Sequence, residues 1–304
     1  MLRRALLTLS ESARVRAFAQ HHPVGRRTSR RFVAGETLDD AFDVVDRLGQ
    51  AGFLLSLNHL GEKTATLEEA AAAAAAYQEI LGRLRGRRED CYVSVKLTQL
   101  GLDGNPEAAI AHLRRILDAA RPAGTFVRVD MEHSVYVDQT LEALLRLRAE
   151  GYEALGAVIQ AYLYRSAADL ERLLAAGIRI RLVKGAYMEP PAIAYPRKPD
   201  VDANYLRLQE RLLADAGYHA MATHDERIVL AAVDQARRLG KSPDRYEFQM
   251  IYGVRRDLQD RLRQEGHRVR IYIPYGTQWY LYFMRRLAER PANVAFILRN
   301  LLRG

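Results

Sequence analysis

Cysteine is nearly absent from this chain of 304 residues, which contains only Cys91. A single cysteine excludes an intrachain disulfide framework and indicates a reducing compartment. Because Cys91 stands at the start of an apolar run, we expect a buried structural thiol rather than a reactive nucleophile.

Long apolar segments are missing as well. No run approaches the ~18 consecutive apolar residues that a membrane-spanning helix needs. The apolar stretch at residues 1–9 is too short for a secretory signal. Its continuation to Arg31 is rich in arginine and serine and has one acidic residue, Glu11, which fits either a transit peptide or an amphipathic arm of a soluble protein. We therefore expect an intracellular protein, cytoplasmic or peripheral on the inner face of the membrane.

Acidic residues are in deficit, because 37 Asp and Glu face 46 Lys and Arg, giving a formal net charge of +9. This balance permits nucleic acid, an anionic membrane surface or acidic small molecules as partners. The arginines are spread along the whole chain, and no basic run is interleaved with aromatic residues as in a single-strand binder. We therefore expect no nucleic-acid partner.

Short β-rich runs alternate with longer helical stretches along most of the chain. The predicted strands cover residues 53–60, 92–98, 126–132, 157–162, 178–184, 220–224, 247–252 and 269–274. The predicted helices cover residues 67–84, 106–120, 138–150, 167–176, 203–216, 226–239, 255–265 and 278–290. Most of the strand runs are apolar on successive residues or alternate large apolar with polar residues, as strands buried on one or both faces do.

Eight β–α units over about 250 residues predict an α/β fold of the (β/α)8 barrel type. The competing architecture is an open doubly wound sheet, but no Gly-x-Gly-x-x-Gly segment follows the first predicted strand. No linker separates a second domain. We expect a helical arm at residues 1–35 and a barrel domain at residues 36–304.

Polar residues stand where the predicted strands end, which is where such barrels carry their catalytic groups. Lys96, Asp130 and Arg181 end the second, third and fifth strands. Charges that point into a barrel are costly unless they are paired. Further polar residues at these ends are Gln160, Lys184, Thr223, His224, Gln249 and Tyr272. The pattern predicts one polar site at the C-terminal rim of the barrel, and no metal site.

Two adjacent arginines, Arg285 and Arg286, lie on the last predicted helix and share a face with Tyr282. A guanidinium pair beside an aromatic ring suits a small substrate with a carboxylate and an apolar body. Arg285 lies about 13 Å along that helix, so the pair can reach the site only if the helix crosses the barrel mouth. Trp279, Tyr280 and Tyr282 would then form an apolar lid.

Several motifs resemble, in the same order, those of the proline dehydrogenase family, flavoenzymes that oxidise L-proline to Δ1-pyrroline-5-carboxylate. They are VKLT at 95–98, RVDME at 128–132, VIQAYL at 158–163, RLVKGAY at 181–187, ATH at 222–224, EFQMIYG at 247–253, and the segment 272–286. The resemblance covers roughly residues 50–300. The resemblance implies a distorted barrel with its last helix over the mouth, and bound FAD.

The resemblance also implies a role for each matching position. The substrate contacts it implies are Lys96, Arg285, Arg286, Tyr272, Tyr282, Leu182 and Glu62. Among these, the two arginines would hold the carboxylate, and Glu62 would pair with Arg285 to close the site. The catalytic residues it implies are Asp130, Arg181 and Lys96. The FAD contacts it implies are Met131, Gln160, Arg181, Lys184, Gly185, Ala186, Thr223 and His224.

In this scheme hydride leaves the ring carbon next to nitrogen for flavin N5, and the surrounding cations favour the neutral amine by lowering its pKa. Either a side chain or solvent, before binding, takes the amine proton. Such enzymes pass electrons to a membrane quinone, so the arm at residues 1–35 would serve either bilayer contact or a homo-oligomer interface. The loop 276–279 is shorter than in bifunctional members of the family.

Two other functions stay open on the sequence alone. A barrel isomerase or lyase acting on a phosphorylated acid would need a glycine-rich anion-binding loop after the seventh or eighth strand, where only Gly253 and Gly276 stand. A basic scaffold could instead bind anionic partners without catalysis.

Overall fold

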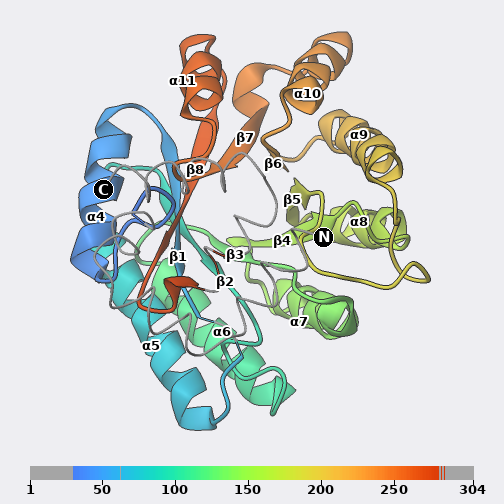
Figure 1. Cartoon of the computed structure of the whole chain (residues 1–304). Coiled ribbons are helices and arrows are strands. Elements are labelled where there is room, and N and C mark those ends of the chain that lie inside the picture. The colour runs from blue at the N-terminus through green and yellow to red at the C-terminus, as the bar shows by residue number, and fades with distance from the viewer. Residues whose placement is uncertain (1–29, 62, 281, 283, 285–304) are drawn as a thin grey trace, which may run out of the picture.

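The computed structural model describes residues 30–61, 63–280, 282 and 284. Eight parallel strands form a closed barrel in sequence order (Figure 1). The strands are β1 (Leu54–His59), β2 (Cys91–Val95), β3 (Val127–Val129), β4 (Leu155–Gln160), β5 (Arg179–Val183), β6 (His219–Ala222), β7 (Tyr246–Ile251) and β8 (Val269–Tyr275). Each overlaps one predicted strand, so the predicted barrel is confirmed.

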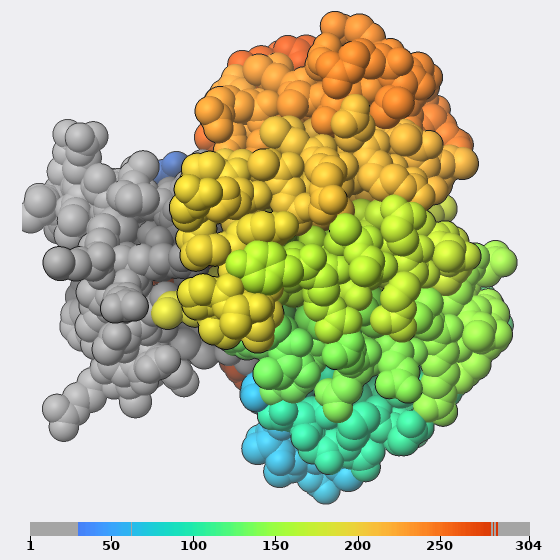
Figure 2. All heavy atoms as spheres, turned by 90° about the vertical axis from the view of Figure 1, so that its right-hand side faces the viewer, coloured from blue at the N-terminus to red at the C-terminus, as the bar shows by residue number. Residues whose placement is uncertain are grey.

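Helices surround this barrel and connect its strands (Figure 1). After the first seven strands come α5 (Leu67–Leu84), α6 (Pro106–Ala120), α7 (Val137–Ala149), α8 (Ser166–Ala175), α9 (Lys198–Ala214), α10 (Glu226–Arg238) and α11 (Arg256–Gln264). From the side, α7 to α10 form successive bands of the outer surface (Figure 2). Within the described residues, no helix combines the length and apolarity needed to cross a bilayer.

Local capping explains why several helix ends agree with the prediction. The side chain of Asn105 accepts a hydrogen bond from the backbone N–H of Ala108, and Pro106 occupies the first turn of α6. Just after the C-terminal ends of α7 and α8, Gly151 and Gly177 adopt φ values of 93° and 66°. A residue with a side chain would be strained in this left-handed conformation.

One helix has no counterpart among the predicted elements. Helix α4 (Leu38–Gln50) precedes β1 and begins with a capping box in which Thr37 and Asp40 bond reciprocally. It packs against β1 and β8, the seam that closes the barrel. Helix α4, which precedes β1, therefore covers the outside of the β1–β8 seam. In a regular barrel the helix that follows β8 would pack there. The predicted arm at 1–35 lies mostly outside the described residues, and the domain division stays a prediction.

The core is apolar between strands and helices but charged inside the barrel. Cys91 is buried as predicted, and burial raises the pKa of its thiol to about 12. Inside, the buried guanidinium of Arg270 donates to both carboxylate oxygens of Glu247, at 2.9 and 3.0 Å. Arg181 is also buried there. Charges in a barrel interior must be paired in this way, because desolvation penalises each one alone.

Candidate active site

A cavity of about 740 Å3 opens at the C-terminal ends of the strands. Most residues predicted from the sequence line it: Lys96, Asp130, Met131, Gln160, Arg181, Lys184, Gly185, Ala186, Thr223, His224, Tyr272 and Tyr282. They come from at least six strands and their following loops, and the structure brings them together at one rim. Glu62, Arg285 and Arg286 lie outside the described residues.

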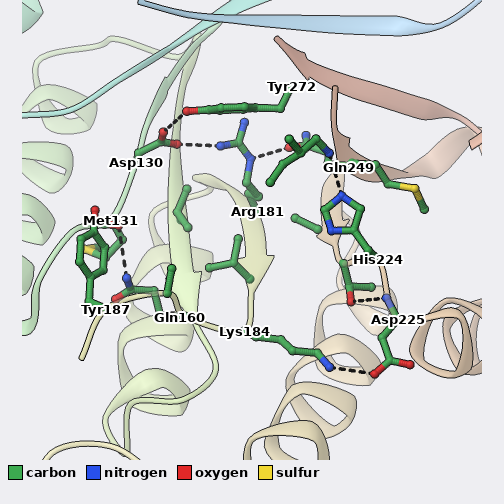
Figure 3. Close-up of a pocket in the computed structure, with 18 of the residues that line it drawn as sticks. Asp130, Met131, Gln160, Arg181, Lys184, Tyr187, His224, Asp225, Gln249 and Tyr272 are labelled. Atoms are coloured by element: carbon green, nitrogen blue, oxygen red, sulfur yellow. Dashed lines mark hydrogen bonds and ion pairs between the residues drawn. The ribbon is translucent and has the colours of Figure 1, made fainter. Parts of the chain in front are cut away.

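Arg181 is at the centre of the site and is 5% exposed. Its Nη1 donates to Asp130 Oδ1 at 2.7 Å, and its Nε donates to Gln249 Oε1 at 2.5 Å. Its Nη2 donates to the hydroxyls of Tyr92 and Ser94, at 3.1 and 2.9 Å. Figure 3 shows Arg181 between Asp130 and Gln249. These bonds fix the guanidinium on three sides. Asp130 supplies the opposite charge that a cation buried inside the barrel needs.

The charge of Arg181 is held firmly by this environment. Burial alone would lower the pKa of the guanidinium, but Tyr92 and Asp130 outweigh burial and raise it. The reciprocal effect appears at Tyr92, where burial raises the pKa but Arg181 and Arg128 lower it overall. The site therefore contains a permanent buried cation next to the cavity.

Asp130 connects this cation to the opposite wall. Its Oδ2 accepts a hydrogen bond from the hydroxyl of Tyr272 at 2.9 Å, and the Arg181 guanidinium lies 5.3 Å from the centre of the Tyr272 ring. Burial, and then Asp130, raise the pKa of Tyr272 well above its usual range. Tyr272 therefore stays a neutral hydrogen-bond donor. Its own ring gives the cavity a flat apolar surface.

A second charged cluster lies at the β5 and β6 side of the cavity. Lys184 Nζ lies 2.6 Å from Asp202 Oδ1 and 3.0 Å from Asp225 Oδ2. Lys198 also pairs with Asp202. Burial alone would raise the pKa of both carboxyls, but Lys184 lowers each one overall. Nearby, His224 Nε2 accepts the backbone N–H of Ile251 at 2.9 Å, which fixes the ring.

Gln160 lines the cavity and has a buried acceptor without a partner among the described residues. The residue is 3% exposed, and its Nε2 donates to the backbone oxygens of Met131 and Glu132, at 3.3 and 3.0 Å. Its Oε1 is buried and has no hydrogen-bond partner among the described residues. A buried acceptor of this kind is costly unless a ligand donates to it. Gln160 therefore places an unsatisfied acceptor in the wall of the cavity.

Gly185 is required by close packing. It adopts a φ of 111°, and a Cβ there would lie 2.1 Å from a ring carbon of Tyr162. Only glycine lets the chain after Lys184 turn across that ring and continue along the cavity.

Leu182 does not line the cavity, contrary to the expectation from the resemblance. Side chains alternate along a strand, and Arg181 and Val183 of β5 line the cavity. Leu182 therefore points to the other face, where it is fully buried in the hydrophobic core.

The segment after β8 reaches the mouth. Gln278 and Tyr282 line the cavity, whereas most of the predicted helix 278–290 lies outside the described residues. Trp279 and Tyr280 are buried in a separate apolar cluster that also contains Tyr282 and Leu60. Of the three predicted lid aromatics, Tyr282 alone is among the cavity's described lining residues.

Several site residues were not assigned roles from the sequence. Tyr187 lines the cavity, and its ring centre lies 4.2 Å from that of His133. Asp225 lines it too, while Tyr92 and Ser94 hold Arg181 from below. Strand alternation could have identified Tyr92 and Ser94, since both share the inward face of β2 with Lys96.

Known proteins are similar to this chain over its whole length. Residues 41–299 match the family described as proline dehydrogenase. Proline dehydrogenase 1 of Bacillus subtilis subsp. natto is 40% identical over 303 residues, which is 100% of both chains. Proline dehydrogenase of Deinococcus radiodurans is 40% identical over 312 residues, 100% of this chain and 99% of that protein.

A solved structure is similar over most of the chain. Proline utilization A from Bdellovibrio bacteriovorus, inactivated by N-propargylglycine, superposes with a TM-score of 0.79 at 28% identity. The match covers 86% of this chain but 32% of that one, so this chain spans about a third of that protein's length.

These matches cover the barrel and the cavity together, and they set aside the isomerase or lyase and the non-catalytic scaffold. The chain belongs to the proline dehydrogenase family, oxidoreductases that act on proline in the first step of its catabolism.

Proposed function

We propose that this protein binds FAD and uses it to oxidise L-proline to Δ1-pyrroline-5-carboxylate. The observation that supports this most directly is the convergence of Lys96, Asp130 and Arg181, from three separate strands, on one cavity. Its volume of about 740 Å3 lies within the range of about 300–1,000 Å3 typical of ligand pockets.

The lining residues fit a flavin. An isoalloxazine ring offers an N–H donor, which would satisfy the orphaned Oε1 of Gln160. Its reduced form gains negative charge, which the permanent cation of Arg181 would stabilise. The residues that we propose to hold FAD are Met131, Gln160, Arg181, Lys184, Gly185, Ala186, Thr223 and His224. When bound, FAD supplies the two-electron acceptor that takes the hydride at N5.

The side chains of this protein would orient and activate proline. Lys96 and Asp130 face the cavity beside the Tyr272 ring, so they can flank a small ring with a carboxylate and an amine. Arg285 and Arg286 would bind the carboxylate through paired hydrogen bonds, and Glu62 would pair with Arg285. The cations lower the pKa of the substrate amine and favour the neutral form that hydride loss requires.

We further propose that the electrons pass to a quinone-type acceptor in a membrane. The net charge of +9 supports contact with an anionic membrane surface. Reoxidation of the reduced protein should therefore be faster with quinone in anionic vesicles than with the same quinone in neutral vesicles. Equal rates at low ionic strength would count against membrane contact.

The central test is the visible spectrum of the purified protein. Flavin bands at about 380 and 450 nm are expected, and L-proline should bleach them without oxygen. Tetrahydrofuran-2-carboxylate, in which oxygen replaces the amine, is the matched control, because it should shift the bands without bleaching them. A colourless protein would refute the cofactor, and bands that persist with L-proline would refute the reaction.

A further inference from the structure

Gln249 of β7 lies inside the barrel between two charged groups and is 3% exposed. Its Oε1 accepts the hydrogen bond from Arg181 Nε at 2.5 Å. Its Nε2 donates to Tyr92 Oη at 2.8 Å and to Glu247 Oε1. Every hydrogen-bonding atom of this amide side chain is therefore engaged, and Figure 3 shows it next to Arg181.

The orientation of the Gln249 amide is set by its neighbours. A guanidinium can only donate, so the amide oxygen must face Arg181. An ionised carboxylate can only accept, so the amide nitrogen must face Glu247. Glu247 is kept ionised because Arg270, bonded to both of its oxygens, lowers its pKa although burial alone would raise it. A flipped amide would oppose donor to donor and acceptor to acceptor.

The amide thus connects the charged barrel interior to the cavity. From Asp90 at the bottom of the barrel the hydrogen bonds run through Arg270, Glu247, Gln249 and Arg181. They continue from Arg181 to Asp130 and Tyr272 at the cavity. Nε of Arg181 carries a single proton, and Gln249 is its acceptor. Gln249 therefore sets the plane in which the other guanidinium nitrogens face the site.

We infer that Gln249 is a positioning residue for hydride transfer, acting through the guanidinium of Arg181. This inference rests on the proposed function, in which Arg181 stabilises the negative charge that develops on the cofactor. Loss of the amide would leave the Nε proton of Arg181 buried without an acceptor, and the guanidinium would tilt. Substrate binding would change little, because the hydrogen-bonding atoms of the Gln249 amide are engaged by Arg181, Tyr92 and Glu247 rather than offered to a ligand.

The test compares Gln249→Met with the parent protein by anaerobic mixing with L-proline. Loss of one hydrogen bond to a charged group predicts flavin reduction slower by about ten- to a hundredfold. The midpoint potential of the flavin should become more negative, since the stabilising cation is displaced. The dissociation constant of tetrahydrofuran-2-carboxylate should stay within about twofold. A crystal structure of the variant should show the Arg181 guanidinium moved from its plane.

Two further variants separate positioning from a general loss of stability. Gln209→Met removes an equally buried amide in α9, bonded to Gln235 at 2.7 Å and absent from the cavity lining, and should leave rate and potential unchanged. Gln249→Glu keeps an oxygen towards Arg181 but places a carboxyl against Glu247. Positioning predicts faster reduction in Gln249→Glu than in Gln249→Met, although the former is the less stable protein.

The opposite order of rates, or a Gln249→Met protein with parental rate and potential, would overturn the inference. If the parent protein itself binds no flavin or is not reduced by L-proline, the proposed function fails instead, so the two failures are distinguishable.

Discussion

We expect His219, at the start of β6, to make the fold sensitive to mild acid. It is 3% exposed, its Nδ1 accepts the backbone N–H of Ile180 at 3.1 Å, and its Nε2 lies 2.9 Å from Asp215 Oδ1. This arrangement requires a neutral ring with its proton on Nε2, because a proton on Nδ1 would face another N–H. Burial lowers the pKa of His219 to about 4, although Asp215 opposes the shift.

The magnitude follows from the difference between the folded and unfolded chains. An unfolded histidine has a pKa of about 6.5, so between that value and about 4 the unfolded chain binds a proton that the folded chain does not. The contribution to stability is fully present above pH 6.5 and is lost as the pH falls towards 4. Between pH 7 and pH 5 the loss is about 2 kcal/mol.

Urea unfolding at pH 7, 6 and 5 measures this loss in the parent protein and in His219→Gln, both with the same cofactor content. The variant should be less stable at pH 7 by about 1–3 kcal/mol, because Ile180 loses its acceptor. Its free energy of unfolding should then fall by about 2 kcal/mol less than that of the parent between pH 7 and pH 5. Comparing slopes cancels the other titrating groups. Parallel pH profiles would refute the reasoning.

Four more substitutions test the site. Asp130→Asn leaves the buried charge of Arg181 without its partner, so the free energy of unfolding should fall by about 3 kcal/mol and flavin reduction should slow; parental values in denaturation and stopped-flow experiments would remove the pair from the site. Lys96→Met should slow flavin reduction while leaving the flavin-to-protein absorbance ratio intact, and full activity would exclude a role for Lys96. Gln160→Leu removes the orphaned acceptor and should lower flavin content after gel filtration, whereas undiminished content would mean that the acceptor faces no cofactor. Arg285→Met should raise the Michaelis constant for proline about tenfold or more and weaken carboxylate inhibitors, and unchanged inhibition would count against carboxylate binding.

Much of the fold was predictable because buried parallel strands leave apolar runs that turn residues interrupt. The bounds of α5 and α6 agree with the prediction, since local caps such as Asn105 decide them. Helix α4 was harder, because a barrel is expected to begin with a strand. Its capping residues, Thr37 and Asp40, are visible in the sequence, but only the β1–β8 seam shows that this helix belongs to the wall.

The site was predictable as a set of residues but not as a network. The rule that strand ends carry catalytic groups, together with the family resemblance, identified Lys96, Asp130 and Arg181. The partners depend on the register between distant strands: Gln249 lies 68 residues from Arg181, and sequence spacing alone does not pair them. Leu182 shows the same limit at short range, because one step along a strand moves a side chain to the opposite face.

Closure of the barrel between β1 and β8 has a consequence for folding during synthesis. The guanidinium of Arg270 donates to the backbone oxygen of Leu55, a residue 215 positions earlier. A nascent chain must therefore be extended by about 215 residues after Leu55 before β1 acquires β8 as its second neighbour. Until then an unpaired strand edge is exposed, and slow, long-range closure of this kind favours aggregation. Helix α4 precedes β1 in the chain and packs against it, so it can cover one face of that strand in the interval while the edge waits for β8.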